Sequence, residues 1–176
     1  TNKAARELKS RVGKKLGIRA KDLWAGTFHS FGLKLLRKYH KEAKLIRDFG
    51  VLDPQDSVQI AKELLKGFKH PEKEAYDGDA LVAMMSHWQE EGRRAAKTDD
   101  PYESAVEWLL PKIEKRYESL GVVDFDRLIL KPIELMENFP EIHKEIQERV
   151  HFLMVDEFQD TNRAQMRLVR LLSQER

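Results

Sequence analysis

Apolar residues recur at intervals of three and four over most of the chain, a spacing that predicts helices. The first stretch of this kind covers residues 2–16, with Asn2 as a plausible N-cap and Gly17 as its end. A second helix is expected from Ser30, which can cap it, through an apolar stripe of Phe31, Leu35, Tyr39 and Ala43. Later helix starts are marked by a cap residue or a first-turn proline: Asp53–Pro54, Asp79, Asp100–Pro101, Asp124 and Pro140. A last helix is expected over about 162–173.

Glycine and proline set further limits on these helices. Gly92 and Gly121 follow apolar stripes and are expected to end their helices. Pro111 and Pro132 fall inside predicted helices, and each is expected to kink or break its helix because proline removes one internal hydrogen bond.

Two stretches have the pattern of strands. Residues 22–27 read as a short strand, and residues 150–155 form an apolar run that stops at two adjacent carboxylates, Asp156 and Glu157. A short apolar run closed by polar residues indicates a strand buried on both faces. Acidic residues at the end of such a strand sit where open α/β sheets place their ligands. The plain alternative is an acidic loop after a strand.

The fold class that follows is mostly α with a small parallel β element. Only two strands are expected, with a long helical stretch between them, and two parallel strands alone make a poor sheet. The pattern fits an incomplete α/β sheet that carries a helical insertion. The start at Thr1, without Met or a signal peptide, suggests the middle of a longer protein.

Charge is distributed unevenly along the chain. Residues 1–47 carry 14 Lys or Arg against Glu7, Asp22 and Glu42, so they sum to +11; the total of +2 leaves −9 for the rest. A basic block before an acidic body suggests that one face meets a polyanion, although solvated helix faces explain most charge runs. The 176 residues contain no cysteine and no apolar run long enough for a membrane span, which fits a cytosolic protein.

Four segments together carry a resemblance to a known family. The string DEFQDTN at 156–162 resembles motif II of the superfamily 1 DNA helicases of the UvrD/Rep/PcrA type. TNKAARELKSRV at the start resembles their motif Ia, GTFHSFGLKLLR at 26–37 resembles motif Ib, and VVDFDRLIL at 122–130 resembles their DFDDL segment. Order and spacing match along essentially the whole chain.

The resemblance implies a partial RecA-like domain, 1A, with a helical 1B insertion. Residues 1–48 and 150–176 would belong to 1A and residues 49–149 to 1B. The parent protein would be an ATP-dependent 3′→5′ helicase that moves along single-stranded DNA and opens the junction with duplex DNA. In that setting Asp156 would hold Mg²⁺ through water, Glu157 would orient or deprotonate the attacking water, and Gln159 would couple the nucleotide to DNA.

DNA contacts are implied for two further groups of residues. Thr1, Asn2 and Lys3 lie at a predicted helix start, where hydroxyl, amide and ammonium donors suit a phosphate. Thr27, Phe28 and His29 repeat that design at the second helix. Phe31 is better explained as a core residue.

The DFDRL segment departs from the family at one position. Asp124 and Phe125 are expected to act as a helix cap and an inward-facing aromatic. Arg127 stands where the family usually has a second acid, which puts any role of that acid in doubt. The six histidines have no i, i+4 ligand spacing, so no structural metal is expected.

The phosphate cradle GxxxxGK[ST] occurs nowhere in the sequence. This chain alone is therefore expected neither to bind ATP tightly nor to unwind DNA, with ATP and Mg²⁺ used only in the parent. Two alternatives stay open: a non-catalytic helical module that binds DNA or protein, and a parent of the RecB/AddA helicase–nuclease kind. The apolar strand at 152–155 would have an uncovered edge, which predicts self-association.

Overall fold

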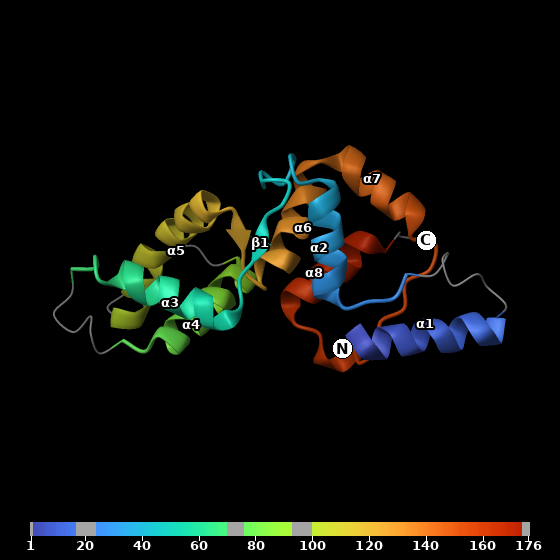
Figure 1. The fold of residues 1–176 in the computed structure, drawn as a ribbon, viewed down its shortest axis with the longest axis horizontal. Coiled ribbons are helices and arrows are strands. Elements are labelled where there is room, and N and C mark those ends of the chain that lie inside the picture. The colour runs from blue at the N-terminus through green and yellow to red at the C-terminus, as the bar shows by residue number, and fades with distance from the viewer. Residues whose placement is uncertain (1, 17–23, 70–75, 93–99, 174–176) are drawn as a thin grey trace.

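A computed structural model describes residues 2–16, 24–69, 76–92 and 100–173, and for residues 2–6 and 16 it describes the backbone alone (Figure 1). The described helices are α1 (Asn2–Leu16), α2 (Phe28–Lys38), α3 (Pro54–Leu65), α4 (Gly78–Glu91), α5 (Pro101–Leu120), α6 (Arg127–Asn138), α7 (Pro140–Arg149) and α8 (Arg163–Leu172), with a short 3₁₀ helix, η2, at Phe158–Asp160. The prediction of a mostly helical chain with a small parallel sheet is confirmed. Over the described residues, no helix combines the length and apolarity that a bilayer crossing requires.

Local capping chemistry sets most helix starts. Asp53 accepts hydrogen bonds from the N–H groups of Gln55 and Asp56 at 2.9 and 3.0 Å, ahead of Pro54. Asp100 caps α5 in the same way. Two caps lie earlier in the chain than expected: Asp77 rather than Asp79 caps α4, and Thr27 rather than Ser30 caps α2. In both cases the residue that satisfies the first helical N–H groups lies two or three positions earlier.

Gly92 and Gly121 end α4 and α5 as expected, with φ of 62° and 65°. The left-handed conformation lets the chain turn away after the last helical turn at little steric cost. Pro111 does not break α5, which continues from Pro101 to Leu120. Pro132 likewise lies inside α6. Tertiary packing on both sides of each proline holds these helices together despite the missing hydrogen bond.

The sheet is built from strands that the sequence pattern did not predict. β1 (Gly50–Val51) and β2 (Val122–Val123) pair in parallel, with Gly50 opposite Val122 and Val51 opposite Val123. The expected strand at 150–155 is wrong: these residues form no ladder, and Phe152 and Met154 are 88% and 81% exposed. Of the expected strand at 22–27, residues 24–27 are irregular, and 22–23 lie outside the described residues.

Two separate buried clusters divide the helices into two lobes (Figure 1). The first lobe, which consists of α3, α4 and α5 and is called the α3–α5 lobe, packs around Trp88, Leu81 and Leu109. The second lobe, made of α2, α6, α7 and α8, packs around Ile133, Met136 and Leu168. A small third cluster joins them where the chain crosses from one lobe to the other: Leu36, Phe49, Val123 and Leu128.

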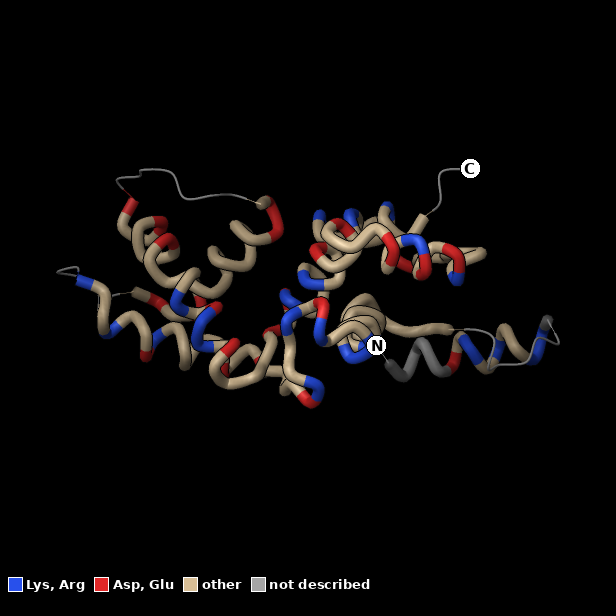
Figure 2. The backbone as a smooth tube through the Cα atoms, turned by 90° about the horizontal axis from the view of Figure 1, so that it is seen from above, with Lys and Arg blue, Asp and Glu red and all other residues tan. Residues whose placement is uncertain are grey.

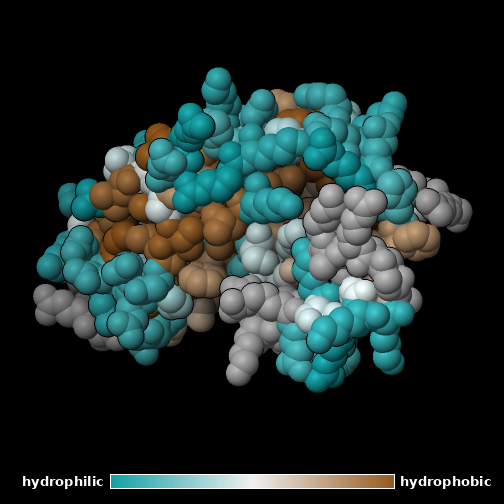
Figure 3. All heavy atoms as spheres, turned by 45° about the vertical axis from the view of Figure 1, so that its right-hand side comes forward, coloured by the Kyte–Doolittle hydropathy of each residue, from teal (hydrophilic) through white to brown (hydrophobic). Residues whose placement is uncertain are grey.

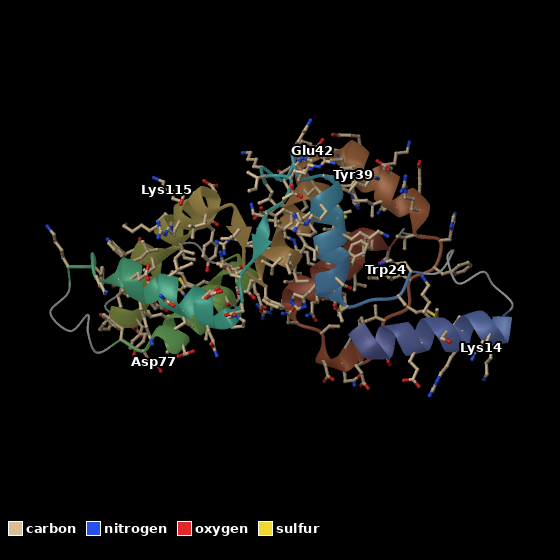
Figure 4. The ribbon with its side chains drawn as sticks, in the orientation of Figure 1. Lys14, Trp24, Tyr39, Glu42, Asp77 and Lys115 are labelled. Carbon is tan, nitrogen blue, oxygen red and sulfur yellow. The ribbon has the colours of Figure 1, made fainter. Side chains whose placement is uncertain are left out.

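The second lobe is held by close backbone contact and by one polar contact at its rim. Gly32 of α2 lies directly against the backbone of Leu128, at the start of α6. At the far end of α2, the hydroxyl of Tyr39 donates to Glu145 of α7 at 2.8 Å (Figure 4). Lys38 donates to the same carboxylate, and these hydrogen bonds lower the pKa of Glu145. α2 is therefore fixed to α6 along its length and to α7 at its end.

Candidate functional site

The segment 156–162 is an exposed loop that leads into α8. Glu157 has φ 50° and ψ 43°, a left-handed conformation that a residue with a side chain rarely adopts. Its carbonyl accepts the N–H of Asp160 at 2.9 Å, and the hydroxyl of Thr161 donates to the carbonyl of Phe158 at 2.7 Å. These local hydrogen bonds fold the chain into η2, shortly after the irregular stretch 152–155.

The three expected catalytic side chains lie together in this loop. Asp156, Glu157 and Gln159 are all exposed, and the Gln159 amide donates to the Glu157 carboxylate. Asp156 Oδ1 accepts the N–H of Glu157 at 3.0 Å. Within the described residues, no group of three or more His, Asp or Glu side chains gathers into a metal cage. An exposed carboxylate nevertheless suits Mg²⁺, which keeps several waters and takes only one or two protein ligands beside a phosphate.

Thr27, Phe28 and His29 form the start of α2. Thr27 Oγ1 accepts the N–H of Ser30 at 3.2 Å, and the Thr27 carbonyl accepts the Ser30 hydroxyl at 2.8 Å. Phe28 is partly buried against the core of the second lobe. Phe31 also packs against that core, which confirms its expected role. Thr27 and Phe28 thus have structural roles of their own, whatever else they contact.

His29 is half-buried, with its ring 5.4 Å from the ring of Phe125 in an edge-to-face arrangement. Burial lowers the pKa of His29 below its usual 6.5, and the nearby Asp126 carboxylate opposes this only in part. The imidazole is therefore neutral at pH 7. It can offer a hydrogen-bond donor to a ligand, but it does not carry the positive charge that a phosphate contact by Lys or Arg supplies.

A lowered histidine pKa predicts a pH dependence of stability. The unfolded chain binds this proton more tightly than the folded chain, so the free energy of unfolding should fall as pH drops below about 6.5 and level off below the folded pKa. His29→Gln should flatten that part of the profile. Urea unfolding of both chains between pH 7.5 and 5 measures it. Equal slopes for the two proteins would show that His29 is not responsible.

The expected phosphate contacts at the amino terminus are only partly described. Thr1 lies outside the described residues, and Asn2 and Lys3 are described as backbone of α1. Beyond them, Lys9, Arg11, Lys14 and Lys15 place positive charge along this helix (Figure 2). Lys14 lies well along α1, away from the two lobes (Figure 4). The first part of the basic block is thus carried on a helix outside both cores.

Asp124 accepts the N–H of Arg127 at 2.9 Å, but the N-cap position of α6 is occupied by Asp126, two residues later than expected. Phe125, expected to face inward, is instead 44% exposed. The unexpected finding is Arg127, which is buried and lies 2.5 Å from Asp124 and 3.2 Å from Glu114. Burial raises the pKa of Asp124, and the Arg127 guanidinium counteracts that rise. The position where the family usually has an acid here carries the basic half of a buried ion pair.

The carboxyl end of α4 contacts both the turn before α6 and the end of the 156–162 loop. The residues involved are Ser86, Glu90 and Glu91 of α4 with Asp126, Asn162 and Arg163. Ser86 donates to Asp126, whose neighbour Phe125 contacts His29. Asn162 Nδ2 donates to Glu90 at 2.6 Å, and Arg163 donates to Glu91 at 2.8 Å. The start of α2 and the 156–162 loop are thus linked through the α3–α5 lobe. Sequence reasoning missed Glu90 and Glu91, which lie outside the family segments.

The chain belongs to the UvrD/REP helicase family, because the profile of that family's N-terminal domain matches residues 1–176 in full. Among curated relatives, the DNA helicase II proteins of Salmonella typhimurium and Escherichia coli K12 are 37% identical over 98% of this chain. ATP-dependent DNA helicase PcrA of Staphylococcus aureus is 32% identical over the same share. The chain spans 24% of the length of each of these relatives.

Proposed function

We propose that this chain is part of a longer ATP-dependent 3′→5′ DNA helicase, which couples ATP hydrolysis to movement on single-stranded DNA and to unwinding at the junction with duplex DNA. The observation that carries the proposal is the exposed carboxylate pair in the 156–162 loop, within a chain whose whole length matches the family. Relatives of this chain bear the names DNA helicase II and ATP-dependent DNA helicase PcrA.

In this proposal the loop supplies one half of a nucleotide site. Asp156 would hold Mg²⁺ through water, and the ion would neutralise charge on the nucleotide phosphates. Glu157 would accept a proton from the attacking water or orient it. Gln159, hydrogen-bonded to Glu157, would transmit the state of the nucleotide to the DNA-binding segments.

Single-stranded DNA would bind across the starts of α1 and α2. Thr1, Asn2 and Lys3 would contact a phosphate at the start of α1, while Thr27, Phe28 and His29 would do so at the start of α2. The neutral His29 ring fits a donor or stacking role. The basic residues of α1 would add contacts to the phosphates that do not depend on DNA sequence.

The domain assignment belongs to the same proposal. Residues 1–48 and 150–176 would be parts of a RecA-like 1A domain, and 1B would lie between them. Although α6 and α7 fall inside 49–149, their apolar side chains pack with those of α2 and α8, which would belong to 1A. A protein that acts on chromosomal or plasmid DNA would work in the bacterial cytosol.

The test is ATP turnover with excess single-stranded DNA. In the full-length protein, Glu157→Gln should lower kcat by about 10²-fold or more, because general-base catalysis contributes about 10²–10⁴. The 176-residue chain alone should show no turnover approaching an ordinary enzyme rate of about 1 s⁻¹.

Glu148→Gln, which changes an exposed glutamate on α7, is the matched control and should leave kcat unchanged. An unchanged kcat in Glu157→Gln would contradict the assignment of the base. Turnover by the 176-residue chain alone would contradict the idea that the missing phosphate cradle is essential.

We also propose that this chain associates with itself through its exposed apolar stretch. Phe152, Met154 and Phe158 are 88%, 81% and 50% exposed, and Val150, Leu153 and Val169 help to line an open hollow of about 420 Å³ beside them. Apolar surface is not confined to this stretch, because the face drawn in Figure 3 carries a hydrophobic band bordered by hydrophilic residues. Exposed patches of this kind mark contact surfaces. Since 152–155 is not a strand, side-chain burial would drive the association.

Sedimentation velocity over a range of concentrations tests the association. The unmodified chain should sediment increasingly as a dimer or larger species, and Phe152→Ser with Met154→Ser should shift it towards monomer. Leu120→Ser, an exposed apolar residue in the other lobe, serves as the control. A monomer at every concentration would contradict the proposal.

A further inference from the structure

We infer that Glu90 and Glu91 of α4 are positioning residues for the 156–162 loop, so that the α3–α5 lobe controls the geometry of the proposed catalytic carboxylates. The inference rests on the proposed function for its consequence in catalysis.

The first contact fixes Asn162. Its Oδ1 accepts the N–H of Gln165 at 2.8 Å, and its own N–H donates to the Gln165 side chain at 3.3 Å, which together form a capping box. The remaining amide group, Nδ2, donates to Glu90 at 2.6 Å. The backbone N–H, the side-chain oxygen and the side-chain nitrogen of Asn162 therefore each have a partner. Because Oδ1 accepts the capping hydrogen bond, Nδ2 is the atom that faces Glu90.

The second contact lies one residue further along. Arg163, the first residue of α8, donates to Glu91 at 2.8 Å. The side chain of Glu91 is only 29% exposed, whereas that of Arg163 is 76% exposed. Two successive residues at the start of α8 are thus held by two successive carboxylates at the end of α4.

The other end of the loop has no such support from the α3–α5 lobe in the described contacts. Hydrogen bonds within 156–162 connect Glu157 to Asp160 and Phe158 to Thr161. These bonds give the loop its shape but do not attach it to a core. The attachment at Asn162 and Arg163 therefore helps to set where Asp156 and Glu157 lie relative to α4, together with the packing of α8 in the second lobe.

The same part of α4 is itself held against the second lobe. Ser86 donates to Asp126, and burial, together with the nearby Asp126 carboxylate, raises the pKa of Glu90. Any movement of the α3–α5 lobe must therefore strain or break contacts to the 124–126 turn and to the loop at once. A partner that displaces this lobe would change the carboxylate geometry without touching the carboxylates.

Amide hydrogen exchange in the 176-residue chain tests the structural part. The N–H groups of Asp160 and Thr161 report on the loop, because both donate within it. In the double variant Glu90→Gln/Glu91→Gln their exchange should accelerate by about threefold to tenfold, the range expected for losing two partly exposed charged contacts.

Glu137→Gln is the matched control, because Glu137 binds Arg167 of α8 through two hydrogen bonds from α6 of the same lobe. It should leave exchange in the loop unchanged. Reversing the second pair, Glu91→Arg with Arg163→Glu, should restore exchange that Glu91→Arg alone accelerates. Unchanged exchange in the double variant, or an equal rise with Glu137→Gln, would overturn the inference.

Catalysis in the full-length protein tests the consequence. Glu90→Gln/Glu91→Gln should lower kcat for ATP by about threefold to tenfold with little change in KM, since the loop is displaced but not removed. A rise in KM alone would overturn the positioning role. If the unmodified full-length protein hydrolyses no ATP, the proposed function fails, and the exchange experiment still decides whether α4 positions the loop.

Discussion

Gly32→Ala should destabilise the chain by about 3 kcal/mol or more, at the upper end of overpacking substitutions. A Cβ at this position would lie 1.7 Å from the carbonyl oxygen of Leu128 and 2.9 Å from its carbonyl carbon. Both atoms are backbone, so no side chain can rotate away. The clash is relieved only if α2 and α6 separate, which opens the buried clusters around Leu36 and Ile133.

Thermal unfolding followed by circular dichroism measures this effect. A loss of about 3 kcal/mol corresponds to a fall in Tm of about 6–12 °C for a chain of this size. Gly67→Ala is the control: its nearest neighbour outside the turn is the Trp108 ring at 3.3 Å, which needs to move only slightly. Equal Tm values for Gly32→Ala and the unmodified chain would show that the two helices are not in the close contact described.

Arg127→Ala should cost about 3–5 kcal/mol, because removing one member of a buried ion pair leaves the other charge without compensation. Arg127 is 7% exposed and Asp124 is 14% exposed as side chains. The guanidinium also lies 4.8 Å from the centre of the Tyr117 ring in α5. One arginine therefore ties α6 to the end of α5, and its loss affects both lobes.

Arg167→Ala provides the comparison, since Arg167 also makes two hydrogen bonds to a single carboxylate but is 55% exposed. Its cost should stay within about 1 kcal/mol, as for surface pairs. Lower pH should reduce the cost of Arg127→Ala. Burial raises the folded-state pKa of Asp124 and Arg127 lowers it, so removing Arg127 raises this pKa further. The variant therefore gains more stability than the unmodified chain as that carboxyl takes up a proton. Urea unfolding at pH 7 and pH 5 measures both effects, and equal costs for the two arginines would contradict the argument.

The sequence predicted helices well and strands poorly, for one physical reason. A helix end is a local event: Asp53–Pro54 and Asp100–Pro101 satisfy their own first-turn N–H groups, and Gly121 adopts its own left-handed turn. A strand exists only if a partner pairs with it. The apolar run at 150–155 has the composition of a buried strand but no ladder, whereas the two-residue pair of β1 and β2 has too short a pattern to detect.

The same difference between local and long-range contacts explains which residues of the candidate site the sequence predicts. Asp156, Glu157 and Gln159 are close in sequence, so a string of seven residues was enough to group them. Glu90 and Glu91 reach the same loop from 72 residues away, and a pair of glutamates at the end of a helix is usually an ordinary solvated surface. In the sequence, Arg127 stands out only as a departure from the family's pattern, and its pairing with Glu114 depends on the packing of α6 against α5.

The pairing of β1 with β2 affects how the length of the segment between these strands can change in evolution. Leu52 donates to the carbonyl of Val123 at 2.8 Å, so the chain leaves for the α3–α5 lobe and returns from it at the same place. The ends of this long excursion are already closed, and closure entropy grows only slowly as the enclosed segment lengthens. The length of the segment between them can therefore change at little cost in closure entropy, as long as Glu90, Glu91 and Glu114 keep their contacts with the second lobe.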